Sequence, residues 1–400
     1  MSVLLENDVR HLILKTGRWQ ILKKIVLIPD SFKGTLTSAQ ICGIVGSKVT
    51  EHFPECEIVA IPVADGGEGS VDCFLTALGG EKVTLAVNNP YFEEMTSFYG
   101  LIDDGKTAVI EMAACAGLPL VEERKDPRKT TTFGVGELIL DAANRGVNKI
   151  IVGLGGSSTN DGGCGAAAAI GIDFYDEQGE KFVPTGGTLS RIRRIDTTKR
   201  TKHLDGIQII TMCDIDNPMY GTTGAAHVFG PQKGADRDMV LLLDEGVRHL
   251  SETIRKDLGM DISLVPGSGA AGAMGAGMIA FFGSTLQMGI EAVLDTVDFS
   301  NIILDADMII TGEGKIDSQS LRGKVVVGVA KRAKLQDKPV IVIAGGADND
   351  IESVYPMGVS SVFTINRLPE AFETSRFKSV QNLTYTADNI MRLIKTVTRG

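Results

Sequence analysis

Short apolar runs rich in Val and Ile alternate along the chain with longer amphipathic segments, and Gly, Ser, Thr or Asp residues separate the two. β-branched runs of this length are typical of buried strands, whereas the segments between them have the length and polarity of helices. Strict alternation of this kind predicts an α/β protein with parallel strands. The predicted strands cover residues 24–28, 58–63, 107–112, 150–154, 207–212, 308–311, 340–344 and 361–365.

Capping residues and glycine turns mark where the helices between these strands should begin. Residues 83–112 differ, because they offer short β runs around Asp104-Gly105, a pair typical of hairpin turns. The second sheet should therefore be mixed, with antiparallel pairs. The predicted helix starts lie near Thr37, Gly69, Gly134, Gly162, Asp236, Gly269, Ser318 and Ser379.

Residues 262–290 carry no charged side chain and contain several small-residue spacings. Pro266 and the many Gly and Ser residues make a poor membrane span, so we expect a buried Gly/Ala helix instead. Charged residues near the N-terminus interrupt any apolar core of a signal peptide. We therefore expect a cytoplasmic protein without a membrane partner, preceded by an extension, residues 1–22, whose role is not readable.

The stretch LGGSSTNDGGCG, Leu154–Gly165, joins a predicted strand to a predicted helix. A Gly-rich turn leaves backbone N–H groups free, and hydroxyl side chains and the positive end of the helix add attraction for anions. The alternative is a tight turn whose polar residues only cap the helix. The first interpretation predicts a cradle for a polyphosphate made by Gly155, Gly156, Ser157, Ser158, Thr159, Asn160 and Asp161.

Four more loops repeat this design, because a strand-like run ends in each at small, acidic or amide residues. Ligands of open α/β sheets bind beyond the carboxyl ends of the strands, so we expect all five loops to converge on one cleft. The residues of interest in the four loops are Asp30, Ser31 and Lys33; Asp65 and Glu68; Asp214, Asp216 and Asn217; and Glu313, Asp317, Arg322 and Lys324.

Several common motifs are absent. Lys324 follows a glycine, but the earlier glycine and the Ser or Thr of a Walker A loop are missing. Gly267, Gly269 and Gly272 match a dinucleotide pattern, yet no long strand precedes them. A serine-hydrolase elbow is also missing from the sequence.

The composition, with 43% hydrophobic residues in 400, is that of a large enzyme with a sizeable core. A formal net charge of −10 argues against nucleic acid or an anionic membrane as partner, so an anionic substrate must be met by particular lysines and arginines. The six cysteines contain no C-x-x-C pair, and the five histidines lack the spacing of metal ligands. We expect reduced thiols and no structural zinc site.

Taken together, the loops resemble those of the bacterial-type (class I) glycerate kinase family, over residues from about 24 to the C-terminus. The resemblance implies ATP-dependent phosphorylation of D-glycerate, with 2-phosphoglycerate favoured over 3-phosphoglycerate. It also implies a flavodoxin-like doubly wound domain from residues 23–90 and 292–400, with an α/β domain inserted at 91–291. The motifs are PDSFKG, VADGGEG, AVIEMAACAGL, TTTFGVGELI, GLGGSSTNDGG, CDIDNP, VFGPQKGA, PGSGAAGA and TGEGKIDSQSLRGK.

Phosphoryl transfer needs charge neutralisation, Mg²⁺ and a positioned hydroxyl, and each need has candidates here. Lys33 or Lys324 would supply positive charge to the transferring group. Asp214 and Asp216, two apart after an apparent strand, would hold Mg²⁺ or else cap a turn. The base is predicted to be Asp317 or Asp65.

The glycerate side of the predicted cleft needs donors for a carboxylate and for hydroxyls. Arg322 is the best fork donor for the carboxylate, with Lys33 next, and Ser31 and Asn160 suit the hydroxyls. Glu68 and Glu313 would contact substrate or shape their glycine turns. An anion-binding module or a Mg²⁺-dependent phosphoesterase stays open as an alternative, as does a homo-oligomer.

Overall fold

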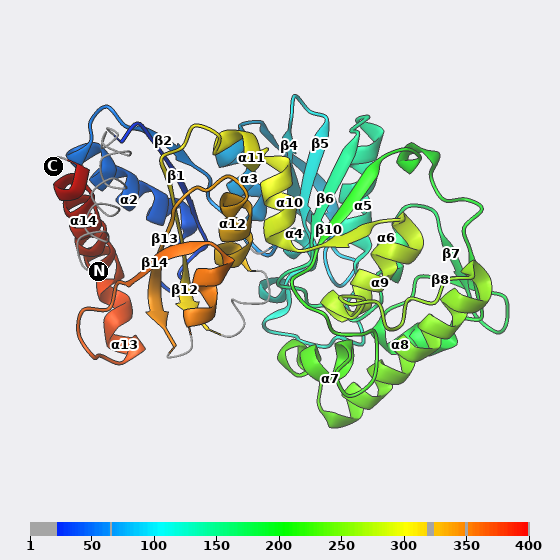
Figure 1. The fold of residues 1–400 in the computed structure, drawn as a ribbon. Coiled ribbons are helices and arrows are strands. Elements are labelled where there is room, and N and C mark those ends of the chain that lie inside the picture. Colours follow the sequence, from blue (N-terminus) through cyan, green and yellow to red (C-terminus); the bar gives the residue numbers. More distant parts are fainter. Residues whose placement is uncertain (1–21, 65, 318–323, 349–350, 399–400) are drawn as a thin grey trace, which may run out of the picture. The chain divides into compact units, whose positions relative to one another are not determined.

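The computed structural model describes residues 22–64, 66–317, 324–348 and 351–398. Contacts between residues divide the chain into two compact units. Unit 1 contains the described residues up to Pro62 and those from Asp298 onward, and unit 2 contains Val63–Val297. In the colour bar of Figure 1, unit 2 covers the colours from residue 63 to residue 297, and the described residues before and after that range belong to unit 1.

Unit 1 is built on a five-stranded parallel sheet with the order β14-β13-β12-β1-β2. Counted within the unit, this order is 2-1-3-4-5, which is the flavodoxin-like arrangement. Its strands are β1 (Lys24–Pro29), β2 (Glu57–Ala60), β12 (Met308–Ile316), β13 (Val340–Ala347) and β14 (Val359–Thr364).

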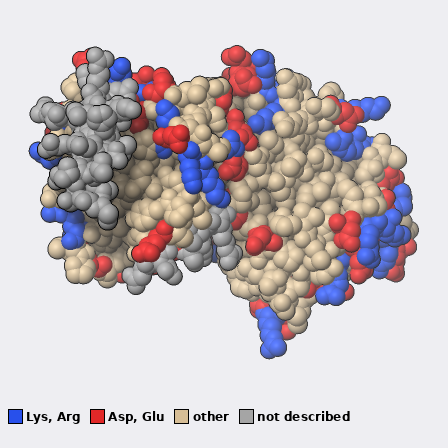
Figure 2. Space-filling view, viewed as in Figure 1, with Lys and Arg blue, Asp and Glu red and all other residues tan. Residues whose placement is uncertain are grey.

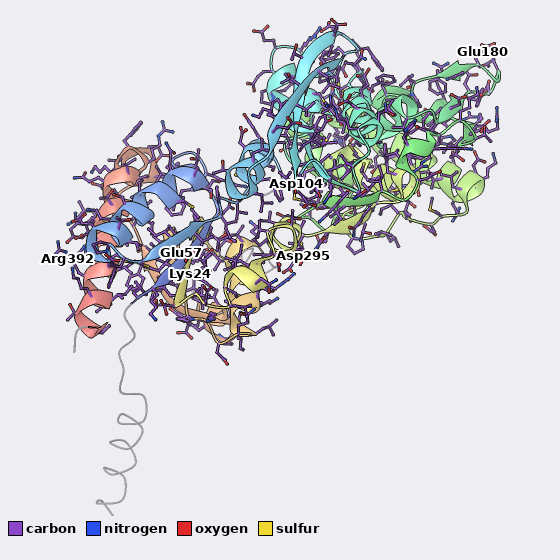
Figure 3. The ribbon with its side chains drawn as sticks, turned by 90° about the horizontal axis from the view of Figure 1, so that it is seen from above. Lys24, Glu57, Asp104, Glu180, Asp295 and Arg392 are labelled. Carbon is purple, nitrogen blue, oxygen red and sulfur yellow. The ribbon has the colours of Figure 1, made fainter. Side chains whose placement is uncertain are left out.

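Helices cover both faces of this sheet, as a parallel sheet requires. Ile25 and Leu27 of β1 pack against α2 (Ser38–His52) and α14 (Ser379–Thr398), which lie side by side, whereas α12 (Val325–Lys334) covers the other face (Figure 1). Lys24, at the start of β1, joins neighbouring segments because its ammonium lies 3.8 Å from Glu57 and 2.6 Å from Asp305; Figure 3 shows Lys24 and Glu57 together.

Unit 2 is built on a six-stranded mixed sheet with the order β11-β10-β6-β5-β4-β3. The pairs from β5 to β11 are parallel, and β3 and β4 are antiparallel to their neighbours. Asp103 and Asp104 both have positive φ in the tight turn between β4 and β5, so the predicted hairpin is confirmed. The strands are β3 (Glu81–Asn88), β4 (Glu94–Ile102), β5 (Thr107–Glu111), β6 (Lys149–Gly153), β10 (Gln208–Met212) and β11 (Thr285–Gln287).

The main core of the protein lies on one face of this sheet. Small and β-branched side chains of three helices pack there against β4, β5 and β6; the helices are α5 (Phe133–Asn144), α6 (Cys164–Ala169) and α9 (Ala270–Phe282). The other face is covered by α3 (Ser70–Leu78) and α10 (Gly289–Thr296) (Figure 1). Unit 2 also contains α4 (Ala113–Ala116), α7 (Ala225–Phe229) and α8 (Arg237–Leu258), and unit 1 also contains α11 (Phe299–Ile302) and α13 (Phe372–Ser375).

A small antiparallel sheet, β8-β7-β9, extends unit 2 with β7 (Asp173–Tyr175), β8 (Lys181–Phe182) and β9 (Arg194–Asp196). Ion pairs such as Lys181–Asp173 and Arg191–Asp176 surround it. Side chains of both signs accordingly alternate over this end of unit 2 on the face drawn in Figure 2.

The predicted α/β class with a mixed second sheet is confirmed, and most element starts agree with the sequence. Thr37 and Asp236 cap α2 and α8, and α14 begins at Ser379. The predicted start at Ser318 lies outside the described residues, and α12 begins at Val325. Among the described residues, no helix is long and apolar enough to cross a membrane.

The boundary between the units differs from the predicted domain boundary. Residues 63–90, assigned from the sequence to the discontinuous domain, group with unit 2. The physical reason is that β3 pairs along its whole length with β4 and that α3 packs on β4 and β5.

Candidate active site

The predicted phosphate loop connects β6 to α6 and is anchored by its carbonyl groups. Gly156, Ser158 and Thr159 accept hydrogen bonds through their carbonyl oxygens from Leu118 N–H, Thr130 Oγ1 and Lys233 Nζ, respectively. Anchoring a turn by its carbonyls leaves its amide hydrogens for another acceptor. The N–H groups of Gly156, Ser157 and Thr159 indeed donate to no acceptor within the described part of the chain.

Three of the five predicted loops come together in unit 2. Gly155 N–H donates to the carbonyl oxygen of Gly66 at 3.0 Å, and a Cβ on Gly155 would collide with the backbone of Gly67. Gly66 in turn lies against the side chain of Met212, the last residue of β10. Glycine is therefore required here for the close approach of two backbones, and the approach brings the loops after β6 and β10 to the Gly66–Gly69 turn.

The phosphate loop contains buried polar atoms that the protein itself does not satisfy. Thr159 and Asn160 have no exposed surface. Thr159 Oγ1 and both polar atoms of the Asn160 amide have no hydrogen-bond partner among the described residues. Buried polar groups are almost always paired in folded proteins, because an unpaired one loses its bonds to water. These atoms indicate a site for a polar ligand.

Two residues of the predicted cradle instead hold the loop in place. Asp161 accepts hydrogen bonds from Thr132 N–H, Thr132 Oγ1, Gly163 N–H and Gly165 N–H, at 2.7–3.2 Å. Burial raises the pKa of its carboxyl group, although these four donors act in the opposite direction. The Ser158 hydroxyl and N–H both bond to the Ala116 carbonyl oxygen. Both side chains are thus committed to the protein, and the backbone remains the donor set for a ligand.

Asp214 and Asp216 follow β10, but the strand ends at Met212. The alternation that would place both side chains on one face of a strand therefore does not apply to them. Asp214 Oδ1 accepts the N–H of Gly289 at the start of α10, at 2.7 Å, and Asp216 is exposed. Carboxylate oxygens suit Mg²⁺, so the donor chemistry fits. The Gly289 bond ties Asp214 to the start of α10, whereas the alternative predicted from the sequence is a turn before Pro218.

Lys233 is the basic residue that the sequence analysis missed. It ends the short 3₁₀ turn Pro231–Lys233, has 1% of its surface exposed, and donates from Nζ to the Thr159 carbonyl oxygen at 2.6 Å. Burial lowers the pKa of its ammonium group to about 7, and the nearby Asp161 carboxylate acts in the opposite direction. The motif VFGPQKGA contains Lys233, but nothing local in the sequence shows that this lysine is buried.

In unit 1 the loops after β1 and β12 adjoin each other. Asp30 N–H donates to the Gly312 carbonyl oxygen at 2.8 Å, and Gly314 packs against the backbone of Phe32 and Lys33. The chain reverses its winding direction between β1 and β12, and such switch points are where doubly wound sheets bind ligands. The described candidates at this edge are Ser31, Lys33, Glu313, Asp317 and Lys324.

The described candidates at this edge differ in exposure. Glu313 is buried within β12, Asp317 directly follows β12 and is half-buried, Lys33 is exposed, and Lys324 is the residue before α12. Asp65, a predicted base, and Arg322, the predicted hydrogen-bond donor to the glycerate carboxylate, lie outside the described residues. Glu68 of unit 2 is exposed.

Comparison with known proteins defines the class of this fold and site. The sequence model described as "Glycerate kinase family" matches residues 25–395. The chain therefore belongs to the glycerate kinase family, and the predicted resemblance is confirmed.

Particular members of the family are similar over nearly the whole chain. A glycerate kinase of Bacillus cereus is 44% identical over 93% of this chain and 98% of its own length. The glycerate 2-kinase of Escherichia coli is 44% identical over 87% of this chain and 93% of its own length. A solved structure described as a candidate glycerate kinase 2 of Salmonella typhimurium LT2 matches with a TM-score of 0.84 and 39% identity, over 95% of this chain and all of that one.

Proposed function

We propose that the protein transfers the terminal phosphoryl group of ATP to D-glycerate, releasing ADP and 2-phosphoglycerate. The observation that carries the proposal is the loop after β6, where N–H groups and the side chains of Thr159 and Asn160 have no hydrogen-bond partner in the part of the chain that the structure describes. Such a donor set suits the oxygens of a polyphosphate. The similarity to a relative named glycerate 2-kinase supports the 2-position of the acceptor.

The proposed roles follow from where the residues lie. Backbone N–H groups of Gly156, Ser157 and Thr159 bind the nucleotide phosphates, and Lys33 and Lys324 carry positive charge at the β1–β12 edge of unit 1. Asp317, half-buried at the end of β12, accepts the proton of the attacking glycerate hydroxyl or orients that hydroxyl. The chemistry of transfer is mainly positioning and charge stabilisation, which these groups supply.

Mg²⁺ is the proposed metal, and Asp214 and Asp216 would hold it. Held by these two carboxylates, Mg²⁺ would supply positive charge that neutralises the charge of the phosphates. Hard carboxylate oxygens are suitable ligands, and one or two of them are enough when the substrate supplies others.

The experiment that tests this function mixes purified protein with ATP and MgCl₂, with and without D-glycerate, and measures ADP. ADP formed only in the presence of D-glycerate supports the kinase, whereas equal ADP release without glycerate indicates a phosphoesterase. Phosphorus NMR of the product distinguishes 2-phosphoglycerate from 3-phosphoglycerate. L-glycerate and glycerol serve as matched controls for the acceptor.

A further inference from the structure

Lys233 is a fully buried cation that the roles above leave unused. Among the described residues, no Asp or Glu carboxylate forms an ion pair with its ammonium, and its one hydrogen bond goes to the Thr159 carbonyl oxygen. An ammonium has three N–H donors, so two remain. Burying a charge without a counter-charge is costly, and proteins keep such groups mainly where they have a function.

The groups next to Lys233 point to what it binds. Lys233 bonds to the carbonyl oxygen of Thr159, and Thr159 Oγ1 and the side-chain amide of the adjacent Asn160 have no hydrogen-bond partner among the described residues. The loop N–H groups of Gly156, Ser157 and Thr159 are unused in the described chain. The Lys233 ammonium thus adjoins the hydroxyl and amide groups of Thr159 and Asn160 in space, a combination suited to an anion with several oxygens.

A strained turn fixes this stretch from behind. Ala271, Gly272 and Ala273 all have left-handed backbone angles, with φ of 53°, 68° and 66°. A Cβ on Gly272 would collide with the Thr159 carbonyl, and Gly162 N–H donates to the Gly272 carbonyl at 3.0 Å. Two alanines in this region of backbone space are unfavourable, and such strain is typical of binding sites whose geometry must be held.

We propose that Lys233 is the cation of the nucleotide phosphate site, acting together with Thr159 Oγ1 and the Asn160 amide. The assignment rests on the proposed kinase function and names a residue that this function did not include. The protonated ammonium keeps its bond to the Thr159 carbonyl and offers its remaining donors to a phosphate oxygen of the nucleotide.

The charged groups around Lys233 influence whether its side chain is protonated, and a test can follow this protonation through the pH. Asp161 of the phosphate loop is the acidic group that acts on it, and it favours the charged form. The side chain of Lys125 lies against Gly234, and His227 of α7 faces Asp244 of α8 at 3.9 Å. Because an anion binds the ammonium form, nucleotide affinity should fall as the pH rises through the pKa of about 7.

The test titrates ADP by calorimetry into wild type, Lys233→Met and the control Lys202→Met, at pH 6 and pH 8.5. Lys202 is exposed and lies in the same unit. At pH 6 we expect Lys233→Met to bind ADP about 10- to 100-fold more weakly than wild type, and Lys202→Met to bind it unchanged. From pH 6 to pH 8.5, the ADP affinity of wild type should fall more than that of Lys233→Met. Protonation of ADP itself changes over this range too, but it affects both proteins equally.

Three results would overturn the assignment. The first is equal ADP affinity, with parallel pH dependence, in wild type and Lys233→Met. The second is a variant in which only the KM for glycerate changes. The third is a kcat that rises through pH 7 only when Lys233 is present, because Lys233 would then act as a proton acceptor. If circular dichroism shows that Lys233→Met does not fold, Lys233→Gln takes its place and the wild-type pH dependence still decides. Absence of ADP binding by wild type would refute the kinase function itself.

Discussion

At the residue scale, the phosphate loop depends on a backbone conformation at Gly156 that other residues rarely adopt. Gly156 has φ of +73° and is exposed, with only Ala113 near the position of a Cβ. A substitution there disturbs the loop amides without filling the core.

Gly156→Val should therefore abolish binding of a non-hydrolysable ATP analogue while leaving the fold largely intact. Calorimetric titration measures the binding, and circular dichroism checks the fold. Gly146→Val is the matched control, because Gly146 has φ of +80° and open space around it in the same unit. Unchanged affinity in Gly156→Val would assign the loop to a purely structural turn.

Lys233 gives a second prediction at this scale, on stability. Its pKa of about 7 lies below the ordinary value of 10.5, so between these pH values the unfolded chain binds more protons than the folded one. Lys233 therefore costs stability fully below pH 7, and this cost is lost as the pH rises toward 10.5. Lys233→Met should raise the free energy of unfolding of the ligand-free protein at pH 6 by on the order of 1–4 kcal/mol.

Denaturant unfolding at pH 6 and pH 9 measures the effect, which should be smaller at pH 9. Lys202→Met should change little at either pH. If Lys233→Met is less stable than wild type at pH 6, the buried ammonium does not destabilise the folded protein, and the prediction is wrong.

At the scale of elements, the candidate site residues lie in the loops at the carboxyl ends of the strands, and the strands and helices hold these loops. The loop after β10 shows how one segment serves both purposes, since Asp214 bonds to the first turn of α10 and Asp216 is exposed. An asparagine at position 214 would keep an acceptor oxygen for the Gly289 N–H but would remove the negative charge of the carboxylate.

Asp214→Asn and Asp216→Asn should each raise the Mg²⁺ concentration needed for half-maximal rate, because a hard-cation site loses one carboxylate. Initial rates over a range of MgCl₂ concentrations measure the Mg²⁺ requirement. Asp205→Asn is the control, because Asp205 is exposed and lies in the same unit. If the Mg²⁺ dependence does not move, the pair only caps its turn.

At the scale of the whole molecule, the candidate residues are divided between the two units. The phosphate loop and Lys233 belong to unit 2, and Asp317 belongs to unit 1. Asp317→Asn should lower kcat by about 10²-fold or more and leave ATP affinity nearly unchanged, because help from a base is felt in the transition state.

Steady-state kinetics together with calorimetry separate these two quantities. Asp337→Asn is the control, since Asp337 is exposed and lies in the turn after α12. Loss of ATP affinity with normal turnover would place Asp317 at the nucleotide, and wild-type kinetics would remove it from the site in favour of Asp65.

The sequence by itself determined the elements, the loops and the family. Val- and Ile-rich runs, capping residues such as Thr37 and hairpin residues such as Asp104 act on near neighbours, so their effects can be read locally. The long motifs determined membership of the glycerate kinase family in the same way, because each is a contiguous string of residues.

Tertiary structure alone decided which polar groups of the loop after β6 bond to the protein and which have no partner among the described residues. Lys233 reaches Thr159 across 74 residues of sequence, Asp161 turns inward to Thr132, and residues 63–90 join unit 2 because β3 pairs with β4. Burial and hydrogen-bond partners depend on segments that are distant in the chain, and no local pattern records them. For this reason the sequence indicated the candidate phosphate loop, but not the buried Lys233 beside it, nor which residues of the loop bond to the rest of the fold.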